Sequence, residues 1–196
     1  FTSGQFYSFA ALLTGPGGVL GASVWLRADA GTSTSTDGAA ISQWNNQSDS
    51  SNNAFQATSN NQPLFKNNSA AAINFNPVVD FDGVNDYVDG ATPVQGTAHS
   101  IFAVGRTNTI VPDGQTFFSC GIPAANSNGY AFRIWTDRIT YVRGSAGTYN
   151  STFTNFNIVN ANQPFQASVT YTNSTNEVNI YKDGSVRQTG TISTSA

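Results

Sequence analysis

The chain has 196 residues, with eight Lys or Arg, eleven Asp or Glu and a net charge of −3 at pH 7. This length suits one large all-β domain and is sufficient to bury a core. The basic residues form no cluster, which argues against a nucleic acid partner, and no apolar stretch is long enough to span a membrane.

Charged residues make up only 10% of the chain, against about 25% in an average domain. Its polar surface must come from Asn, Ser, Thr and Gln, a composition typical of secreted or cell-surface proteins. The single cysteine, Cys120, has no internal disulfide partner. Because Phe117, Phe118 and Ile122 surround it in the sequence, it is predicted to be a buried small hydrophobe, with a reactive or intermolecular thiol as the alternative.

Residues 1–19 are predicted to be a lead segment or linker, followed by one domain over residues 20–196. Residues 6–13, FYSFAALL, are apolar but short and lack a basic flank. They could be the trimmed start of an exported chain, a linker or a strand. Residues 15–18, GPGG, form a loop that marks the start of the domain.

Short strands are predicted at residues 24–27, 54–57 and 63–65, with a short strand or a turn that buries Trp44 at residues 41–44. The stretch VVDFDGVNDYV at residues 78–88 follows, and we expect the chain to be organised around it. Its β-branched and aromatic residues predict a strand, a tight polar turn over residues 82–86 and a second strand. Gly83 can take a positive φ in that turn.

The second half predicts a series of antiparallel strands, at residues 99–106, 115–121, 129–135, 138–143, 165–172, 177–182 and 186–190. Residues 99–106 and 129–135 alternate in side-chain character, and the Asp-Gly pair at residues 183–184 predicts a hairpin. Residues 144–157 are predicted to be a polar loop. No segment shows helical periodicity, so we expect an all-β antiparallel sandwich of about a dozen strands.

Two blocks carry a family resemblance. One is VVDFDGVNDYV, and the other is PFQASVTYTNSTNEVNIYKDGSVRQTG at residues 164–190. In their form, order and separation they resemble the concanavalin A-like, laminin-G-like jelly-roll domains. Residues 24–32, 41–48 and 61–66 resemble a bacterial subgroup of these domains, found in large modular proteins that are secreted or anchored at the cell surface. The resemblance implies a jelly-roll β-sandwich of the lectin and glucanase type.

That family usually carries one or two further strands after the last hairpin, whereas the tail of this chain is TISTSA at residues 191–196. The resemblance therefore implies a domain truncated at its C-terminal strands, with an exposed sheet edge. Neighbouring domains or protomers are the expected partners of such an edge. Jelly rolls host lectins, glycanases, adhesive modules and spacers, so the fold alone does not settle the function.

An acidic cluster surrounds the central turn. Asp82, Asn85 and Asp86, with Asp80 and Asp89 beside them, supply closely spaced oxygens. Such oxygens could hold Ca²⁺, the one cofactor that the sequence suggests. The alternative is turn chemistry, in which Asp and Asn bond their own backbone. The spacing does not match an EF-hand loop.

A second candidate site is glycan binding by aromatic residues. Trp135 and Tyr130 lie at the two ends of one predicted strand, Tyr141 lies on its partner, and Asp137 and Arg138 lie at the turn. A sugar site needs an aromatic platform and a few polar groups. The alternative is that the aromatic residues, Trp25 and Trp44 among them, are structural packing.

Catalytic residues are sparse. Glycoside hydrolysis normally needs two carboxylates, and the chain contains one glutamate, Glu177. The pair Asp80 and Asp82 fits the predicted turn, and the one histidine, His99, has no nucleophile motif beside it. We therefore expect no enzyme.

The first hypothesis is a non-catalytic binding or adhesion module of an exported cell-surface protein, in contact with a glycan or another surface protein. The second is a structural module, or a subunit of a surface filament that exchanges a strand with its neighbour. A polysaccharide-active enzyme is the third and least favoured.

Overall fold

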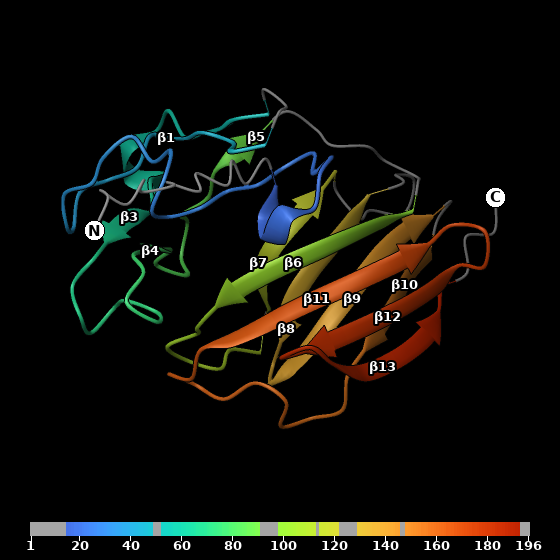
Figure 1. The fold of residues 1–196 in the computed structure, drawn as a ribbon. Helices are drawn as coiled ribbons and strands as arrows, with labels where there is room; N and C mark the ends of the chain where they lie inside the picture. The colour runs from blue at the N-terminus through green and yellow to red at the C-terminus, as the bar shows by residue number, and fades with distance from the viewer. Residues whose placement is uncertain are drawn as a thin grey trace, which may run out of the picture. The chain divides into compact units, whose positions relative to one another are not determined.

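The computed structural model describes residues 15–48, 52–90, 98–112, 114–121, 129–145 and 148–192. Over these residues it contains thirteen strands, two short 3-10 helices and no α-helix. The strands form four antiparallel sheets (Figure 1), which confirms the predicted all-β class. Within the described ranges, no helix has the length and apolar character needed to cross a membrane. The segment at residues 6–13 and most of the C-terminal tail lie outside the described residues.

The chain divides into two compact units, Phe1–Ala91 and Thr92–Ala196. In the first unit, a three-stranded sheet has the order β1-β2-β5, and β3 pairs with β4. Its elements are η1 (Pro16–Gly18), β1 (Gln43–Trp44), β2 (Ala54–Phe55), η2 (Ser59–Asn61), β3 (Leu64–Lys66), β4 (Val78–Asp80) and β5 (Asp89–Gly90). Residues 24–27, predicted to be a strand, contribute only one isolated bridge, between Arg27 and Ala30.

The central stretch forms a strand, a turn and a second strand in the predicted order, although the second strand, β5, begins only at Asp89. β4 pairs with β3, and β5 pairs with β2, so the chain on the two sides of the turn enters different sheets. Two hydrogen bonds of the Tyr87 backbone explain why the chain enters a second sheet. The N–H of Tyr87 donates to the carbonyl of Asn61, and its own carbonyl accepts from the Gln56 side chain. These bonds direct the chain away from β4. Gly83 has a positive φ of 73°, as predicted.

The first unit is held largely by bonds between side chains and backbone, because its strands are only two or three residues long. Buried Gln56 donates to the Tyr87 carbonyl and accepts from the N–H of Thr58. The indole of Trp44 donates to the carbonyl of Arg27. The abundant Asn, Gln, Ser and Thr therefore replace part of the ladder bonding that a longer sheet would supply.

The second unit contains two four-stranded sheets, with the orders β10-β9-β8-β7 and β13-β12-β11-β6 (Figure 1). The strands are β6 (His99–Gly105), β7 (Gln115–Cys120), β8 (Tyr130–Trp135), β9 (Arg138–Ser145), β10 (Thr148–Phe153), β11 (Phe165–Thr172), β12 (Glu177–Lys182) and β13 (Ser185–Thr191). All neighbours are antiparallel. All seven predicted strands of this half are found, and their ends differ from the predicted ones by at most two residues.

The core of the second unit lies between its two sheets. One cluster of buried residues joins Phe132, Ile134 and Ile139 from the first sheet to Ala167, Val169, Val178 and Ile180 from the second. Phe117 contacts Phe132 and Phe165 with ring centroids 5.6 and 5.9 Å apart. Each large side chain buried in this way stabilises the fold by about 1.5–3 kcal/mol. The face-to-face packing makes the unit a β-sandwich.

The two-residue period predicted for β6 and β8 is confirmed. On β6, Ile101 and Ala103 pack against the core, whereas Phe102 and Val104 are 72% and 68% exposed. Cys120 ends β7 and is buried, as predicted. The Asp183-Gly184 pair has positive φ at both residues and joins β12 to β13.

One strand was not predicted. Residues 148–153 were expected in a loop, yet they form β10, which pairs with β9 from Ser145↔Thr148 to Thr140↔Phe153. β10 is an edge strand of its sheet, and its sequence TYNSTF is polar. Hydrophobicity alone therefore gave no signal for it.

A polar cluster closes one end of the core. His99 stacks on Tyr130 with ring centroids 4.2 Å apart, and its Nε2 shares a 2.9 Å hydrogen bond with the Tyr141 hydroxyl. Arg143 is only 4% exposed and lies over Tyr171, 4.4 Å from the ring centroid. Within the described residues its Nε and Nη1 have no hydrogen-bond partner. The cation–π contact partly offsets the cost of burying this charge.

The buried phenol of Tyr141 should make the protein sensitive to alkali. Burial raises the pKa of Tyr141 above its ordinary value of 10.0, and Arg143 opposes that change. Because the folded pKa exceeds the unfolded one, the stabilisation is complete below pH 10 and declines as the pH rises toward the folded pKa. We expect Tyr141→Phe to reduce the decline in unfolding free energy above pH 10, by up to ~1.4 kcal/mol per pH unit.

The measurement is urea unfolding at several pH values between neutrality and strong alkali. Tyr141→Phe also removes the bond to His99, so its stability at neutral pH should fall by about 1 kcal/mol. Tyr87→Phe, which alters an exposed phenol, is the control. An identical alkaline slope in Tyr141→Phe and the parent chain would contradict the expectation.

Candidate functional site

The outer face of the β10-β9-β8-β7 sheet brings polar and aromatic side chains together. The antiparallel register sets Arg133 of β8 opposite Thr140 of β9, and Thr140 opposite Phe153 of β10. The neighbouring row pairs Trp135 with Arg138. Because side chains alternate across a strand, these residues face away from the core, which takes Phe132, Ile134 and their neighbours.

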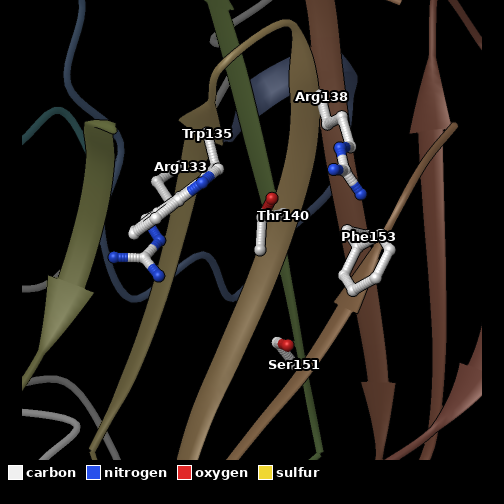
Figure 2. A pocket seen from close by; sticks show the side chains of 6 residues that line it. All are labelled: Arg133, Trp135, Arg138, Thr140, Ser151 and Phe153. Carbon is white, nitrogen blue, oxygen red and sulfur yellow. The ribbon is translucent and has the colours of Figure 1, made fainter. Parts of the chain in front are cut away.

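These rows enclose a hollow of about 340 Å³. Its lining residues are Arg133, Trp135, Arg138, Thr140, Ser151 and Phe153, and we call it the Trp135 hollow. Figure 2 shows Thr140 between the guanidinium groups of Arg133 and Arg138, with Phe153 beside Arg138. Trp135 is 40% exposed and Phe153 is 47% exposed. The hollow therefore offers aromatic surface together with hydroxyl and guanidinium groups.

Both arginines of the hollow lie against aromatic rings. The guanidinium carbon of Arg133 is 4.4 Å from the centroid of the Trp135 ring. That of Arg138 is 4.7 Å from the Phe153 ring and 3.4 Å from the Phe156 ring. Contacts of this kind hold a planar guanidinium in place without using its N–H groups.

Three polar atoms near the turn between β8 and β9 are buried without a hydrogen-bond partner in the described structure. They are Oγ1 of Thr140, Nε of Arg138 and Oδ1 of Asp137. Thr140 as a whole is 5% exposed. Buried polar atoms in folded proteins nearly always have a partner, so each of these needs an explanation.

The sequence-predicted ligand residues do not all share this face. Trp135 lines the hollow, while Asp137 lies in the adjoining turn and is not part of the lining. Tyr130 is 3% exposed and packs in the core, where Tyr141 also lies. The structure thus separates Trp135 from Tyr130, because five positions along β8 carry them to opposite faces.

Four lining residues were not singled out from the sequence: Arg133, Thr140, Ser151 and Phe153. Arg133 and Thr140 could have been found from the alternation of β8 and β9, since both fall on the same side as Trp135 once the turn is placed. Ser151 and Phe153 required the strand β10, which the sequence analysis treated as loop. The weak signal there was the β-favouring Thr and aromatic content of residues 148–153.

The predicted metal-binding residues use their oxygens within the turn. Asp82 Oδ1 accepts from the N–H groups of Val84, Asn85 and Asp86 at 2.8–3.3 Å. Asp86 Oδ2 accepts from the N–H of Asp82, and the Asn85 amide donates to Asn60 and Asn61. Among the described residues, no three His, Cys, Asp or Glu side chains lie close enough to hold a metal ion. These bonds match the turn-chemistry alternative.

Two of the residues that were weighed for catalysis, Glu177 and His99, bond to neighbouring side chains. Glu177 accepts a 2.6 Å hydrogen bond from Asn179 on the same strand. His99 lies in the polar cluster at the end of the core. Asp80 ends β4 and Asp89 begins β5.

A second hollow, of about 450 Å³, lies in the first unit and is lined by Asn67, Ser69, Ala72, Asn74 and Phe75. Asn74 and Phe75 have φ of 48° and 65° in a turn that is closed by bonds between Ile73 and Asn76. A positive φ is unusual for a bulky aromatic residue. Phe75 is fully exposed.

Comparison with known proteins gave no match, whether with family models, with curated proteins or with solved structures. The resemblance to concanavalin A-like domains therefore stays a prediction. Function must be inferred from the surfaces of the molecule itself, and the Trp135 hollow has the most varied chemistry of those described.

The central turn should depend on the Asp82 carboxylate. The N–H groups of Val84, Asn85 and Asp86 hold the pKa of Asp82 below its ordinary value of 3.8. A lowered folded pKa means that the stabilisation is present above pH 3.8 and is lost as the pH falls through the folded value. We expect Asp82→Ala to speed amide hydrogen exchange at Val84 and Asn85 at neutral pH, while Asp82→Asn, which keeps an acceptor oxygen, has a smaller effect.

Asp89→Ala is the control, since the described structure shows no bond to that side chain. Added Ca²⁺ provides a second comparison. If Ca²⁺ slowed exchange at the turn in the parent chain but not in Asp82→Ala, these oxygens would be ion ligands and the turn account would be wrong.

Proposed function

We propose that the chain is a non-catalytic binding and adhesion module of an exported cell-surface protein, and that a glycan is the ligand of the Trp135 hollow. The exposed indole of Trp135 at the edge of a polar hollow carries this proposal. A sugar ring has apolar C–H faces and a rim of hydroxyls, and it needs an aromatic surface beside hydrogen-bonding groups. The hollow provides both within one sheet face.

Packing around Trp135 supports a rigid platform. Arg133 stacks on the ring, and Gly114 lies so close that a Cβ there would be 3.4 Å from Cε3 of the indole. Gly114 has a φ of 83°, which allows this close approach. A platform that is held in place before binding loses little conformational entropy when a ligand arrives.

The finer fold assignment is part of the same proposal. A sandwich of two four-stranded antiparallel sheets is the architecture expected of a jelly roll of the concanavalin A type. The sequence blocks at residues 78–88 and 164–190 support it. The scarcity of charged residues supports an exported, cell-surface location.

The test is binding to an array of plant, algal and animal glycans, followed by titration of the best ligand. We expect Trp135→Ala to weaken binding by roughly tenfold or more, because the loss of about 1.4 kcal/mol of contact energy corresponds to a factor of ten. Phe102→Ala, which removes an exposed aromatic side chain from the other sheet, is the matched control and should bind like the parent. Equal binding by Trp135→Ala and the parent would refute a Trp135-centred site.

A structural or filament-forming module is the second candidate, and one observation favours it. Phe102 and Val104 are exposed side by side on the outer face of β6. β6 is an edge strand, and no described strand pairs with its other side. An exposed apolar edge invites pairing with another chain.

Sedimentation across a range of protein concentrations tests the second candidate. Self-association in the parent chain that is lost in the double variant Phe102→Ser, Val104→Thr would favour assembly through β6. Val186→Thr, which alters an exposed apolar residue on the opposite edge strand, β13, should change nothing. A parent chain that stays monomeric at every concentration would exclude this self-assembly.

A further inference from the structure

The lining of the Trp135 hollow carries positive charge only. Two of its six residues are arginines, and none is Asp or Glu. This is a local concentration, since the whole chain has eight basic residues and a net charge of −3. An anion would therefore be attracted to the hollow more than to the rest of a mildly acidic chain.

Arg138 has no acidic partner in the described structure. The ion pairs found there join Arg27 to Asp29 and Lys182 to Asp183. Asp137 is adjacent to Arg138 in the sequence, yet no ion pair joins the two. Arg138 is nevertheless held in place, because its guanidinium lies against both Phe153 and Phe156. Its buried Nε has no hydrogen-bond partner among the residues that the structure describes.

Thr140 adds a second, independent observation. It lies in the centre of the lining (Figure 2), it is more than nine-tenths buried, and its Oγ1 has no partner within the described residues. A buried hydroxyl without a partner is uncommon in a folded protein. Carboxylate and sulfate groups accept several hydrogen bonds. A guanidinium and a neighbouring hydroxyl can donate them together.

We propose that the ligand of the Trp135 hollow is an acidic glycan, and that its carboxylate or sulfate group binds Arg138 beside Thr140. This inference rests on the proposed function and adds the chemical class of the sugar. The guanidinium supplies a planar, always-charged donor, and the aromatic rings around it fix its orientation. The indole of Trp135 contacts the sugar ring that carries the acidic group.

The competing explanation is that Arg138 only covers the sheet. Val142 and Thr140 face outward and yet are buried, and long arginine side chains can shield such positions with their methylene groups. A variant must therefore keep the stem and remove the charge. Arg138→Gln removes the charge and keeps part of the stem. Arg138→Lys keeps a charge but loses the planar guanidinium.

The probes are two matched pairs of oligosaccharides. Tetragalacturonate and its methyl ester differ in the carboxylate charge and the ester methyl group, and a κ-carrageenan oligosaccharide and its desulfated form differ only in the sulfate. Calorimetric titration gives the affinity ratio of the charged to the uncharged member of each pair. We expect a ratio of roughly ten or more in at least one pair. The pair with the high ratio identifies the acidic group.

Arg138→Gln should bring that ratio close to one, Arg138→Lys should give an intermediate value, and Trp135→Ala should weaken both members alike. Arg187→Gln, which removes an exposed charge on β13, should leave the ratio unchanged. The ratio should also fall as salt is added, since salt screens the attraction. Thermal unfolding of each variant checks that the fold is kept.

The outcomes separate the two proposals. If the charged and uncharged members bind equally, glycan binding stands and the acidic preference is wrong. If Arg138→Gln and Arg138→Lys are both folded and keep the parent ratio, Arg138 is not the receptor of the anion. If neither pair binds while neutral glycans bind on the array, the acidic class is again wrong. If no glycan binds at all, the proposed function fails first.

Discussion

The register between β8 and β9 determines both faces of the sheet that carries the candidate site. Phe132 lies opposite Tyr141 on the inner face, and Arg133 lies opposite Thr140 on the outer face. A slip by one residue would put the arginine into the core and the phenylalanine into solvent. The hydrophobic gain from the inner face therefore fixes the position of the guanidinium and hydroxyl groups on the outer one. Core and site are specified by the same alternation.

Most of the second unit follows from local patterns. Strands such as β11 and β12 show two-residue alternation that ends at turn residues, and the Asp183-Gly184 pair has the positive φ values that this turn requires. The structure of the first unit follows less well from local sequence patterns. Its strands are too short for periodicity to show, and long-range bonds such as that from Gln56 to Tyr87 decide where the chain goes. Side-chain bonds of this kind have no signature in the sequence.

For the same reason, only part of the candidate site could be predicted from the sequence. Trp135 beside a predicted turn attracted attention as an aromatic residue next to polar groups. Two of the residues that line its hollow, Ser151 and Phe153, come from β10, and that strand is too polar for hydrophobicity to reveal. Tyr130 was paired with Trp135 because the two lie on one strand, but only the two-residue period shows that they point in opposite directions. A surface on a sheet is assembled across strands, and cross-strand neighbours are set by register.

The pairing of β6 with β11 has a consequence for how the second unit is made. The strands β7 to β10 form one sheet through connections between neighbours in the chain, as do β11 to β13, and such contacts close quickly. β6 instead pairs with β11, which comes in the chain only after all four strands of the other sheet. This closure costs the most chain entropy, so β6 is expected to dock last. During synthesis it leaves the ribosome early and carries unpaired backbone and apolar side chains until β11 emerges, which makes this interval the one in which the nascent chain most needs protection from aggregation.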